Sequence, residues 1–432
     1  MIMRKYLQYF LKNLARLVMA KYDPEVVGIT GSIGKTGAKN AVTAVLSRRW
    51  VVRASPKNYN NELGLPLTII GIESGGRSPG AWLMVVWRAV CLLLRTDKNY
   101  PEVLVLELGV DKPGDMDYLL SMVKLRAAVL TYIGSSHLEN FGSHWKLIAE
   151  KKKIFNGLAK DGWAIVNLDN EAAATVVGEL KHRALTYGFN EAADVRAQNV
   201  IFRFQDSDDI NSLAGVNFKI KYQEAVIPIL LPGVIGQPAI YASLAAAAVG
   251  LAFGLNGVTI AEALRDYPLA AGRMRLLAGT KETMIIDDTY NAAPQSVLAA
   301  LDTLDQIRLA TSRRKWIVLG DMLELGGDSE AGHRLIGARV ATIPKARLLF
   351  TGRLAHYYGL GAREAGMPEE RIQNFNNHQE IIDYLEANIA ANDLILVKGS
   401  QGARMEKVVK ALLAEPARAG DLLARQEARW LD

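Results

Sequence analysis

The sequence predicts an α/β protein with two successive domains, each built on a mostly parallel sheet. Short β-branched runs alternate with helix-compatible stretches along most of the 432 residues, as in parallel sheets covered by helices. β-type runs within 195–232 and a linker-like stretch at 266–273 interrupt this alternation before it starts again. We therefore predict an N-terminal helix over 1–24, a central domain over 25–267 and a C-terminal domain over 268–432.

The composition is that of a soluble globular chain too long for a single core. Half of the residues are apolar and 22% are charged, with 51 basic and 45 acidic residues giving a net charge of +6. This mild excess suits anionic ligands, and the absence of a dense basic run with interleaved aromatic residues argues against nucleic acid as a partner. Cys91 is the only cysteine, which excludes disulfides within the chain and favours the reducing cytoplasm.

Residues 1–22 have the pattern of an amphipathic helix. Apolar residues recur at helical spacing, and lysines and arginines occupy the remaining faces. One interpretation is a helix that packs on the central domain. The other is a basic helix that lies on an anionic membrane surface, because the segment is too charged to span a bilayer.

The β-branched run Val26–Ile29 ends in a glycine-rich turn. The loop residues are Gly31, Ser32, Ile33, Gly34, Lys35 and Thr36. A helix-compatible segment begins at Lys35 and Thr36 and reaches about Arg48. This order places backbone N–H groups and a helix N-terminus around one small volume where a polyphosphate fits. Lys35 would reach the outer phosphates and the Thr36 hydroxyl would bind Mg²⁺. The strict phosphate-loop pattern requires glycine where Ile29 stands, so a plain glycine turn with a solvated lysine is the alternative.

Glu107 follows the apolar run Val103–Leu106, and further strands are predicted at 127–133 and 163–168. A carboxylate at the tip of a strand beside a phosphate loop is where a nucleotide-bound Mg²⁺ needs an oxygen ligand. A glutamate that simply faces water is the other interpretation. His137 follows the next strand and becomes a candidate second metal ligand at the same sheet edge.

Three further segments have an unusual composition. The segment 57–66 is dense in amides, among them Asn60 and Asn61, and forms a loop suited to a polar substrate. The segment 81–94 carries Arg88 as its only charge and is shorter than the roughly 20 residues that cross a bilayer. We expect a buried helix there rather than a hairpin touching lipid. In the run 151–153, we expect two of the three lysines to be solvated.

The sequence resembles the Mur ligases, ATP-dependent enzymes that form amide bonds in cell-wall synthesis, from about residue 25 to 415. The resemblance rests on four groups of residues that occur in the family's order: the loop 31–36; the segment 58–68; the segment 137–143 with Lys151 and Phe155; and the segments 288–296, 319–326 and 398–400. It implies a phosphate-loop ATPase domain at the centre and a Rossmann-like domain at the C-terminus.

The resemblance also implies roles for individual residues. Thr36 and Glu107 would hold a first Mg²⁺, His137 would hold a second, and Lys151 would carry a carbamate that acts as a metal ligand. Lys35, Lys151 and His137 are the expected catalytic residues. Asn291 would contact the adenine, Asp321 the ribose and Arg273 the phosphates. Expected contacts with the other substrates come from Asn60, Asn61, Lys398 and Ser400.

The implied reaction converts a carboxylate into an acyl phosphate with ATP, after which an amine displaces phosphate. The expected substrates are D-alanyl-D-alanine and a UDP-linked muramoyl tripeptide, and the expected cofactors are ATP, two Mg²⁺ ions and a carbamylated lysine. We expect a cytoplasmic monomer, and weak, peripheral contact with the inner membrane surface stays open as an alternative.

The sequence departs from the family pattern in three places. Only about 25 residues precede the phosphate loop, where the family usually has a domain that holds uridine diphosphate. Gly236-Gln237-Pro238-Ala239 lacks the family's histidine and asparagine, and 81–94 resembles an insertion. Two alternatives therefore stay open: a Mur-like ligase for another carboxylate, smaller or lipid-linked, and a relative that binds nucleotide without ligation. The intact Lys35, Thr36, Glu107, His137 and Lys151 argue against the second.

Overall fold

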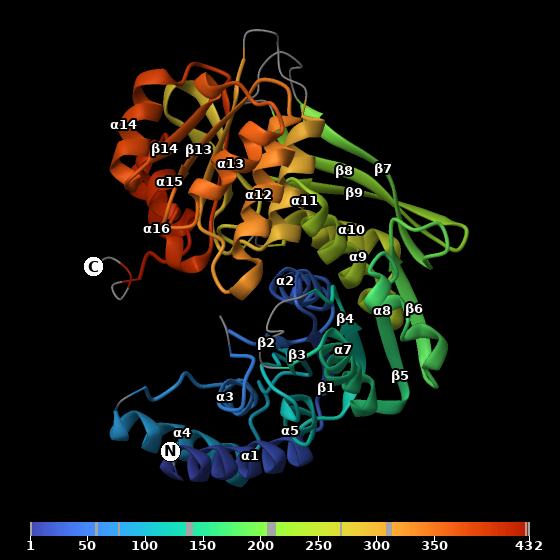
Figure 1. The fold of residues 1–432 in the computed structure, drawn as a ribbon. Helices are drawn as coiled ribbons and strands as arrows, with labels where there is room; N and C mark the ends of the chain where they lie inside the picture. Colours follow the sequence, from blue (N-terminus) through green and yellow to red (C-terminus); the bar gives the residue numbers. More distant parts are fainter. Residues whose placement is uncertain are drawn as a thin grey trace. The chain divides into compact units, whose positions relative to one another are not determined.

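The structure is a computed structural model that describes residues 2–56, 59–76, 78–134, 141–204, 213–267, 270–307, 313–427 and 430. Its contacts divide the chain into two compact units. Unit 1 comprises Met1–Gln198, Lys219–Ile229 and Ile240–Pro268, and unit 2 comprises Asn199–Phe218, Leu230–Ala239 and Leu269–Asp432. Figure 1 shows the α/β fold that the sequence predicts.

The larger sheet has nine strands in the order β2-β3-β1-β4-β5-β6-β7-β8-β9. The strands are β1 (Glu25–Thr30), β2 (Val52–Ala54), β3 (Val103–Glu107), β4 (Leu125–Leu130), β5 (Leu158–Asn167), β6 (Arg183–Gly188), β7 (Val195–Phe204), β8 (Leu213–Tyr222) and β9 (Ala225–Pro232). From β2 through β7 each neighbouring pair is parallel. Only two residues separate β8 from its neighbour β9, so this pair is an antiparallel hairpin, and the predicted antiparallel excursion is confirmed there.

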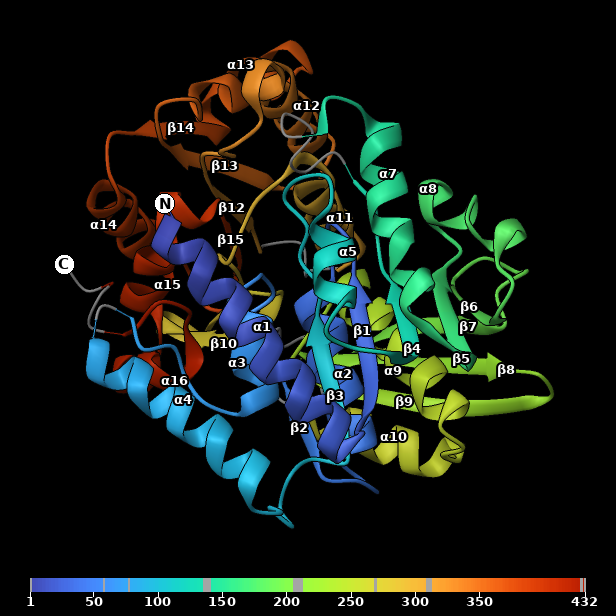
Figure 2. The ribbon, with the colours of Figure 1, turned by 90° about the horizontal axis from the view of Figure 1, so that it is seen from below.

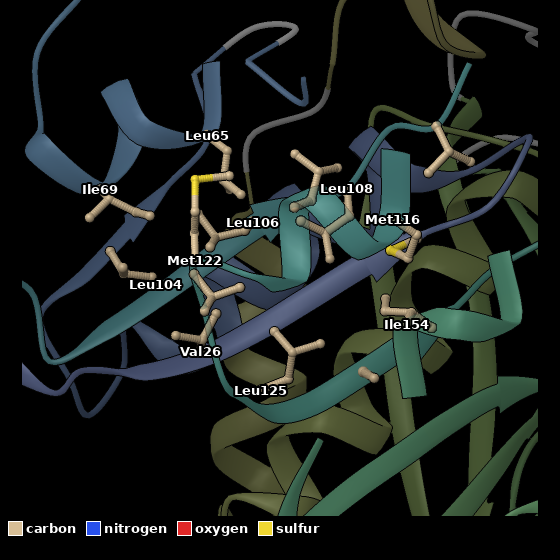
Figure 3. Close-up of a cluster of buried hydrophobic side chains, with 14 of the residues drawn as sticks. Val26, Leu65, Ile69, Leu104, Leu106, Leu108, Met116, Met122, Leu125 and Ile154 are labelled. Atoms are coloured by element: carbon tan, nitrogen blue, oxygen red, sulfur yellow. The ribbon is translucent and has the colours of Figure 1, made fainter. Parts of the chain in front are cut away.

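Alternation along β3 separates the apolar core from the candidate site. Leu104 and Leu106 point into a buried cluster, joined by Leu108 just beyond the strand, whereas Glu107 belongs to the opposite set of side chains. Figure 3 shows this cluster, in which side chains from β1, β3 and β4 meet those of the surrounding helices. Among the helices that contribute are α1 (Ile2–Tyr22), α3 (Gly64–Ile70), α4 (Pro79–Leu94), α5 (Asp115–Leu120) and α7 (His144–Lys152).

Helix α1 is an integral part of unit 1. Its Leu11, Ala15 and Val18 are completely buried in the cluster. At its C-terminal end, Lys21 Nζ donates to the carbonyl oxygens of Leu92 (2.8 Å) and Leu93 (3.0 Å) in the last turn of α4, where a cation is favourable. Figures 1 and 2 show α1 and α4 side by side. The interpretation of residues 1–22 as a packed helix is confirmed.

Helix α4 corrects the expectation for residues 81–94. The segment is a helix, begun by Pro79 and by the Ser78 hydroxyl, which accepts from the Ala81 N–H. Of its residues, however, only Val85, Ala89 and Leu92 are buried, so the prediction of a buried helix is wrong for the other half of its surface. An apolar composition on all sides cannot show which side will be covered.

Unit 2 is built on a six-stranded sheet of order β10-β11-β15-β12-β13-β14, in which all neighbours except β10 and β11 are parallel. Its strands are β10 (Arg275–Gly279), β11 (Thr283–Asp288), β12 (Lys315–Gly320), β13 (Ala346–Thr351), β14 (Ile372–Phe375) and β15 (Leu394–Lys398). One face packs against α11 (Pro294–Gln306), α12 (Ser329–Ala341) and α13 (His356–Glu364), and the other against α14 (His378–Asn388) and α15 (Glu406–Leu412). This doubly wound arrangement is the predicted Rossmann-like fold.

Further α-helices lie in the described residues. They are α2 (Lys35–Leu46), α8 (Glu171–Ala174), α9 (Gln237–Ala252), α10 (Gly257–Asp266) and α16 (Ala419–Leu422). In the part of the chain that the structure describes, no helix is both long enough and apolar enough to cross a membrane.

If α1 is part of the core of unit 1, its two faces must respond differently to substitution. Leu11→Ala leaves a cavity and should lower the free energy of unfolding by about 2–5 kcal/mol. Leu17→Ala, a matched change on the exposed face, should alter it by less than about 0.5 kcal/mol. Urea unfolding followed by circular dichroism measures both, and equal effects would contradict the packing of α1.

Candidate active site

The phosphate loop has the backbone conformation that its glycines allow. Gly31 has a φ of +149° and Gly34 has a φ of +89° at the N-cap of α2, in regions that favour glycine. A Cβ atom on Gly31 would lie 2.0 Å from the Thr131 hydroxyl oxygen, which itself donates to the Ile33 carbonyl at 2.7 Å. The Ser32 N–H donates to the Tyr132 carbonyl at 2.6 Å, so the loop is held against the end of β4.

The two polar side chains of the loop lie at the start of α2. Lys35 is the first residue of this helix, and its Nζ donates to the Gly31 carbonyl at 2.8 Å. Thr36 is the second residue and is half-buried. The loop therefore has a helix N-terminus, a lysine and a hydroxyl around one volume, which suits a polyphosphate.

Glu107 is 2% exposed, so the interpretation as a water-facing strand end is wrong. Its register opposite Ile29 of β1 places it beside the strand that leads into the phosphate loop. Lys39 Nζ, on α2, lies 3.4 Å from Glu107 Oε1 and donates to the Ser55 carbonyl at 2.7 Å. Within the described residues, Glu107 Oε1 accepts no hydrogen bond, which is costly for a buried carboxylate.

Lys151 is also 2% exposed, and its Nζ donates to the Gly31 carbonyl at 3.2 Å. Burial, and secondarily the positive charge of Lys35, lower the pKa of Lys151 to about 7. The Lys151 amine is then uncharged in a large fraction of the molecules near neutral pH. Lys152 and Lys153 instead pair with the carboxylates of Glu179 and Asp117 on the surface, as expected for two of the three lysines.

The amide-rich loop reaches the same strand end. The Asn60 carbonyl accepts from the Gly109 N–H at 2.8 Å, two residues beyond Glu107. The Asn61 Oδ1 atom accepts from the N–H groups of Leu63 (3.2 Å) and Gly64 (3.0 Å) and so orders the start of α3. Their contact with substrate stays a prediction. His137 and Asn58 lie outside the described residues, so the second metal ligand stays a prediction too.

In unit 2 the predicted residues gather at the carboxyl ends of three adjacent parallel strands, β11, β15 and β12, where open α/β sheets bind ligands. The Ser400 N–H donates to the Asp321 carbonyl at 3.0 Å. The Ser400 hydroxyl donates to the Ala292 carbonyl at 3.1 Å, beside the exposed Asn291. The Asp321 carboxylate accepts from the N–H groups of Arg353 and Leu354, both at 3.0 Å.

Lys398 has a structural partner in the same cluster. Its Nζ lies 2.5 Å from Asp288 Oδ2 and donates to the Asn291 carbonyl at 2.9 Å. Burial raises the pKa of the Asp288 carboxyl even though Lys398 opposes that shift. Lys398 and Ser400 therefore hold the loop that carries Asn291, and direct contact with substrate stays a prediction for both.

Arg273 lies with its guanidinium 4.3 Å from the centre of the Tyr290 ring.

The loop 289–291 is also held from the C-terminal tail, because Arg425 donates to the Thr289 carbonyl (3.1 Å) and to Glu406 Oε2 (2.9 Å). Arg425 and Lys39 were not predicted from the sequence. Lys39 follows Lys35 by one helical turn, and this spacing indicates that the two side chains lie on one face of the helix. No local sequence pattern marks Arg425.

The cluster in unit 1 fits a divalent cation held mainly by phosphate. Mg²⁺ is commonly bound by one or two carboxylates together with substrate phosphates and water. Among the described residues no three His, Cys, Asp or Glu side chains form a metal-binding group. Glu107 Oε1 is buried, has Lys39 as its charge partner at 3.4 Å and accepts no hydrogen bond among the described residues, so it is the kind of carboxylate oxygen that a shared protein–phosphate site requires.

Comparisons with known proteins show the family of the chain. Residues 89–250 match the Mur ligase middle domain, and residues 272–401 match the Mur ligase, glutamate ligase domain. The chain is 30% identical over 408 residues to the UDP-N-acetylmuramoyl-tripeptide–D-alanyl-D-alanine ligase of Bacillus subtilis, covering 94% of this chain and 79% of that protein.

Two solved structures have the same fold. A crystal structure of MurF from Acinetobacter baumannii superposes with a TM-score of 0.76 at 25% identity, covering 94% of this chain and 81% of that one. MurF from Thermotoga maritima in complex with ADP gives a TM-score of 0.76 at 23% identity, covering 94% and 83%, and shows likeness of fold alone.

The burial of Lys151 predicts a pH-dependent stability difference. The lysine has a pKa of 10.5 when unfolded and about 7 when folded, so between these values the unfolded chain binds a proton that the native chain does not. The stability of the parent therefore rises with pH across this window, and the full cost of burying the charge is present below it. In buffer without CO₂ or Mg²⁺, Lys151→Met should be more stable than the parent at pH 6.

This advantage of Lys151→Met should shrink as the pH approaches 10, and urea unfolding over the pH series measures it. Lys152→Met, which removes a neighbouring surface cation, should show no such trend. A stability difference between the parent and Lys151→Met that does not change with pH would show that the amine is not titrating inside the fold.

The buried pair in unit 2 predicts that Lys398 is needed for folding. Lys398→Met leaves the Asp288 carboxylate buried without its partner and should cost about 3–5 kcal/mol of stability. The double variant Lys398→Met/Asp288→Asn should recover part of that loss. Unchanged denaturant stability in Lys398→Met would instead assign the lysine to substrate alone.

Proposed function

The chain belongs to the Mur ligase family, and we propose that it joins D-alanyl-D-alanine to a UDP-N-acetylmuramoyl-tripeptide, releasing ADP and phosphate. The observation that carries the proposal is the burial of two ionisable groups at the phosphate loop, the Glu107 carboxyl and the Lys151 amine. The choice of substrates rests on the name of the Bacillus subtilis relative.

The proposed reaction has two chemical steps. A carboxylate oxygen of the tripeptide attacks the γ-phosphorus of ATP, and the bond to the β,γ-bridging oxygen breaks to release ADP and form an acyl phosphate. The amine of D-alanyl-D-alanine then attacks the acyl carbon, loses a proton and expels phosphate. In both steps negative charge develops on oxygen, so fixed positive groups contribute more than a covalent nucleophile would.

The loop 31–36 supplies the binding groups for the phosphates. Its backbone N–H groups and the N-terminus of α2 would hold the β- and γ-phosphate oxygens. Lys35 would exchange its present bond to the Gly31 carbonyl for the outer phosphate. The Thr36 hydroxyl and the Glu107 carboxylate would hold Mg²⁺, which supplies charge neutralisation to the phosphates, and His137 would hold a second Mg²⁺.

Lys151 is proposed to carry a carbamate. The lone pair of its neutral amine attacks CO₂, forming an N–C bond, and one amine proton is lost to solvent. The low pKa makes this reaction possible near neutral pH. Next to Lys35, a second buried cation is unfavourable, whereas a carbamate reverses the sign of the charge and supplies oxygen atoms suited to a metal.

In unit 2, Asn291 is proposed to contact the adenine, Asp321 the ribose and Arg273 the phosphates. The exposed Asn291 sits on a loop fixed by Lys398 and Ser400, which supports a positioned contact rather than a mobile one. Substrate contacts from Asn60 and Asn61 are proposed for unit 1. We further propose a monomer, working in the cytoplasm on small-molecule substrates.

The activity test is ATP-dependent phosphate release with a UDP-muramoyl-tripeptide, with and without D-alanyl-D-alanine. Lys35→Ala removes a positive charge from the phosphates and should lower kcat by about 10²–10³ with the fold intact. Lys160→Ala, an exposed lysine on β5, is the matched control and should retain activity. Release only with a different carboxylate, smaller or lipid-linked, would replace the proposed substrate by the alternative one.

The carbamate is tested by substituting Lys151 itself. Lys151→Ala should nearly abolish ligation, and added small carboxylic acids should partly restore it by occupying the vacated metal-ligand position. Lys151→Arg should stay inactive, because a guanidinium cannot form a carbamate or bind a cation. An active Lys151→Arg enzyme would overturn the carbamate.

A further inference from the structure

The exposed side of α1 is apolar rather than polar. Tyr6, Tyr9 and Phe10 are 71%, 68% and 46% exposed, and Leu17 continues the stripe at 54%. These positions follow helical spacing on the face opposite to the buried Leu11, Ala15 and Val18. An amphipathic helix on a globular domain normally turns its polar side outward, so this stripe is unusual.

Helix α4 has a second stripe of the same kind. Leu83, Met84 and Trp87 are 71%, 59% and 64% exposed, and Leu94 ends the stripe at 80%. The helix is well defined, with a serine N-cap and buried Val85, Ala89 and Leu92 on its other side. The apolar exposure is therefore a property of a folded surface.

The two helices are fixed to one another. Beyond the contacts of Lys21, the Tyr22 hydroxyl donates to the Leu92 carbonyl at 3.0 Å and accepts from the Asp97 N–H at 2.9 Å. In Figure 2, α1 and α4 lie in front of α3 and of the strands of unit 1. We call the exposed residues of these helices the α1/α4 surface: Tyr6, Tyr9, Phe10, Leu17, Leu83, Met84, Trp87 and Leu94.

The charge of these helices has one sign. Residues 2–22 and 79–94 contain no aspartate or glutamate, and their charged residues are Arg4, Lys5, Lys12, Arg16, Lys21 and Arg88. Arg16 is exposed within the apolar stripe of α1, and the exposed Arg95 and Lys98 follow α4. Of these cations, Arg88 pairs with Asp97 at 2.8 Å. An apolar aromatic surface on two helices that carry cations and no carboxylate is complementary to an anionic surface.

We propose that the α1/α4 surface docks unit 1 on the surface of an anionic lipid bilayer. Tyrosine and tryptophan favour the boundary between headgroups and acyl chains, and lysine and arginine are attracted to anionic headgroups. One marginal amphipathic helix binds lipid weakly, whereas two helices locked together insert their apolar side chains as one unit. The inference goes beyond the proposed reaction and does not depend on its substrate.

A second copy of the chain suits this surface less well. A two-fold contact would place the same patch against itself, bringing cations against cations with no acidic residue in either helix to oppose them. Lipid phosphate groups supply the missing negative charge. We therefore propose an anionic bilayer, rather than a second copy of the chain, as the binding partner of the α1/α4 surface.

Flotation of the full chain with vesicles tests the inference. The protein should float at low salt with vesicles of phosphatidylcholine and phosphatidylglycerol in equal amounts, stay at the bottom with phosphatidylcholine alone, and be released by high salt. Leu83→Ser/Trp87→Ser should weaken vesicle binding at least about tenfold, since two exposed side chains no longer enter the apolar layer. Trp145→Ser, which removes a 74% exposed tryptophan on α7, should bind like the parent.

Circular dichroism melting confirms that each variant is folded, and ATP-dependent phosphate release shows whether loss of vesicle binding leaves the enzyme active. Parent protein that stays at the bottom with anionic vesicles at low salt would overturn the proposal. So would equal flotation of the Leu83→Ser/Trp87→Ser variant. A parent dimer that this variant converts to a monomer in sedimentation, without vesicle binding by either, would assign the surface to a second copy.

Discussion

The candidate site in unit 1 depends on charge buried beside the phosphate loop. Lys151 reaches the Gly31 carbonyl, and Lys39 and Glu107 face each other at 3.4 Å, all three almost excluded from water. Burying such groups is unfavourable unless a partner or a change of protonation compensates. The constraint has two signs: the pKa of Lys151 is low, and Glu107 Oε1 accepts no hydrogen bond from any residue that the structure describes. In the proposed reaction, phosphate, Mg²⁺ and CO₂ would compensate both groups.

The parallel sheets explain how these groups come together. Side-chain alternation puts Leu104 and Leu106 into the apolar core and leaves Glu107 on the other face, beside α2. Adjacent parallel strands also form the site in unit 2. There β11, β12 and β15 end next to one another and bring Asn291, Asp321 and Lys398 into one cluster. In each unit a rigid sheet supplies the position and the loops supply the chemistry.

Features that depend on a short stretch of residues could be predicted from the sequence. The phosphate loop, the strand ending at Glu107 and the two alternating α/β regions each have short-range signals. Packing partners far apart in the sequence could not be predicted in this way: the bond from Arg425 to the Thr289 carbonyl spans 136 residues. The exposed half of α4 was missed because apolar residues of several kinds occur on all its sides, so composition did not distinguish the covered face from the uncovered one.

The proposed carbamate requires Lys151 to be an uncharged amine that reacts with CO₂ beside the phosphate loop. Carbon-13 NMR of the protein equilibrated with ¹³C-bicarbonate and Mg²⁺ at pH 8 tests it most directly. We expect a carbamate carbonyl resonance in the parent that disappears in Lys151→Met and persists in Lys152→Met. A parent without this resonance, or one whose resonance survives in Lys151→Met, would contradict it.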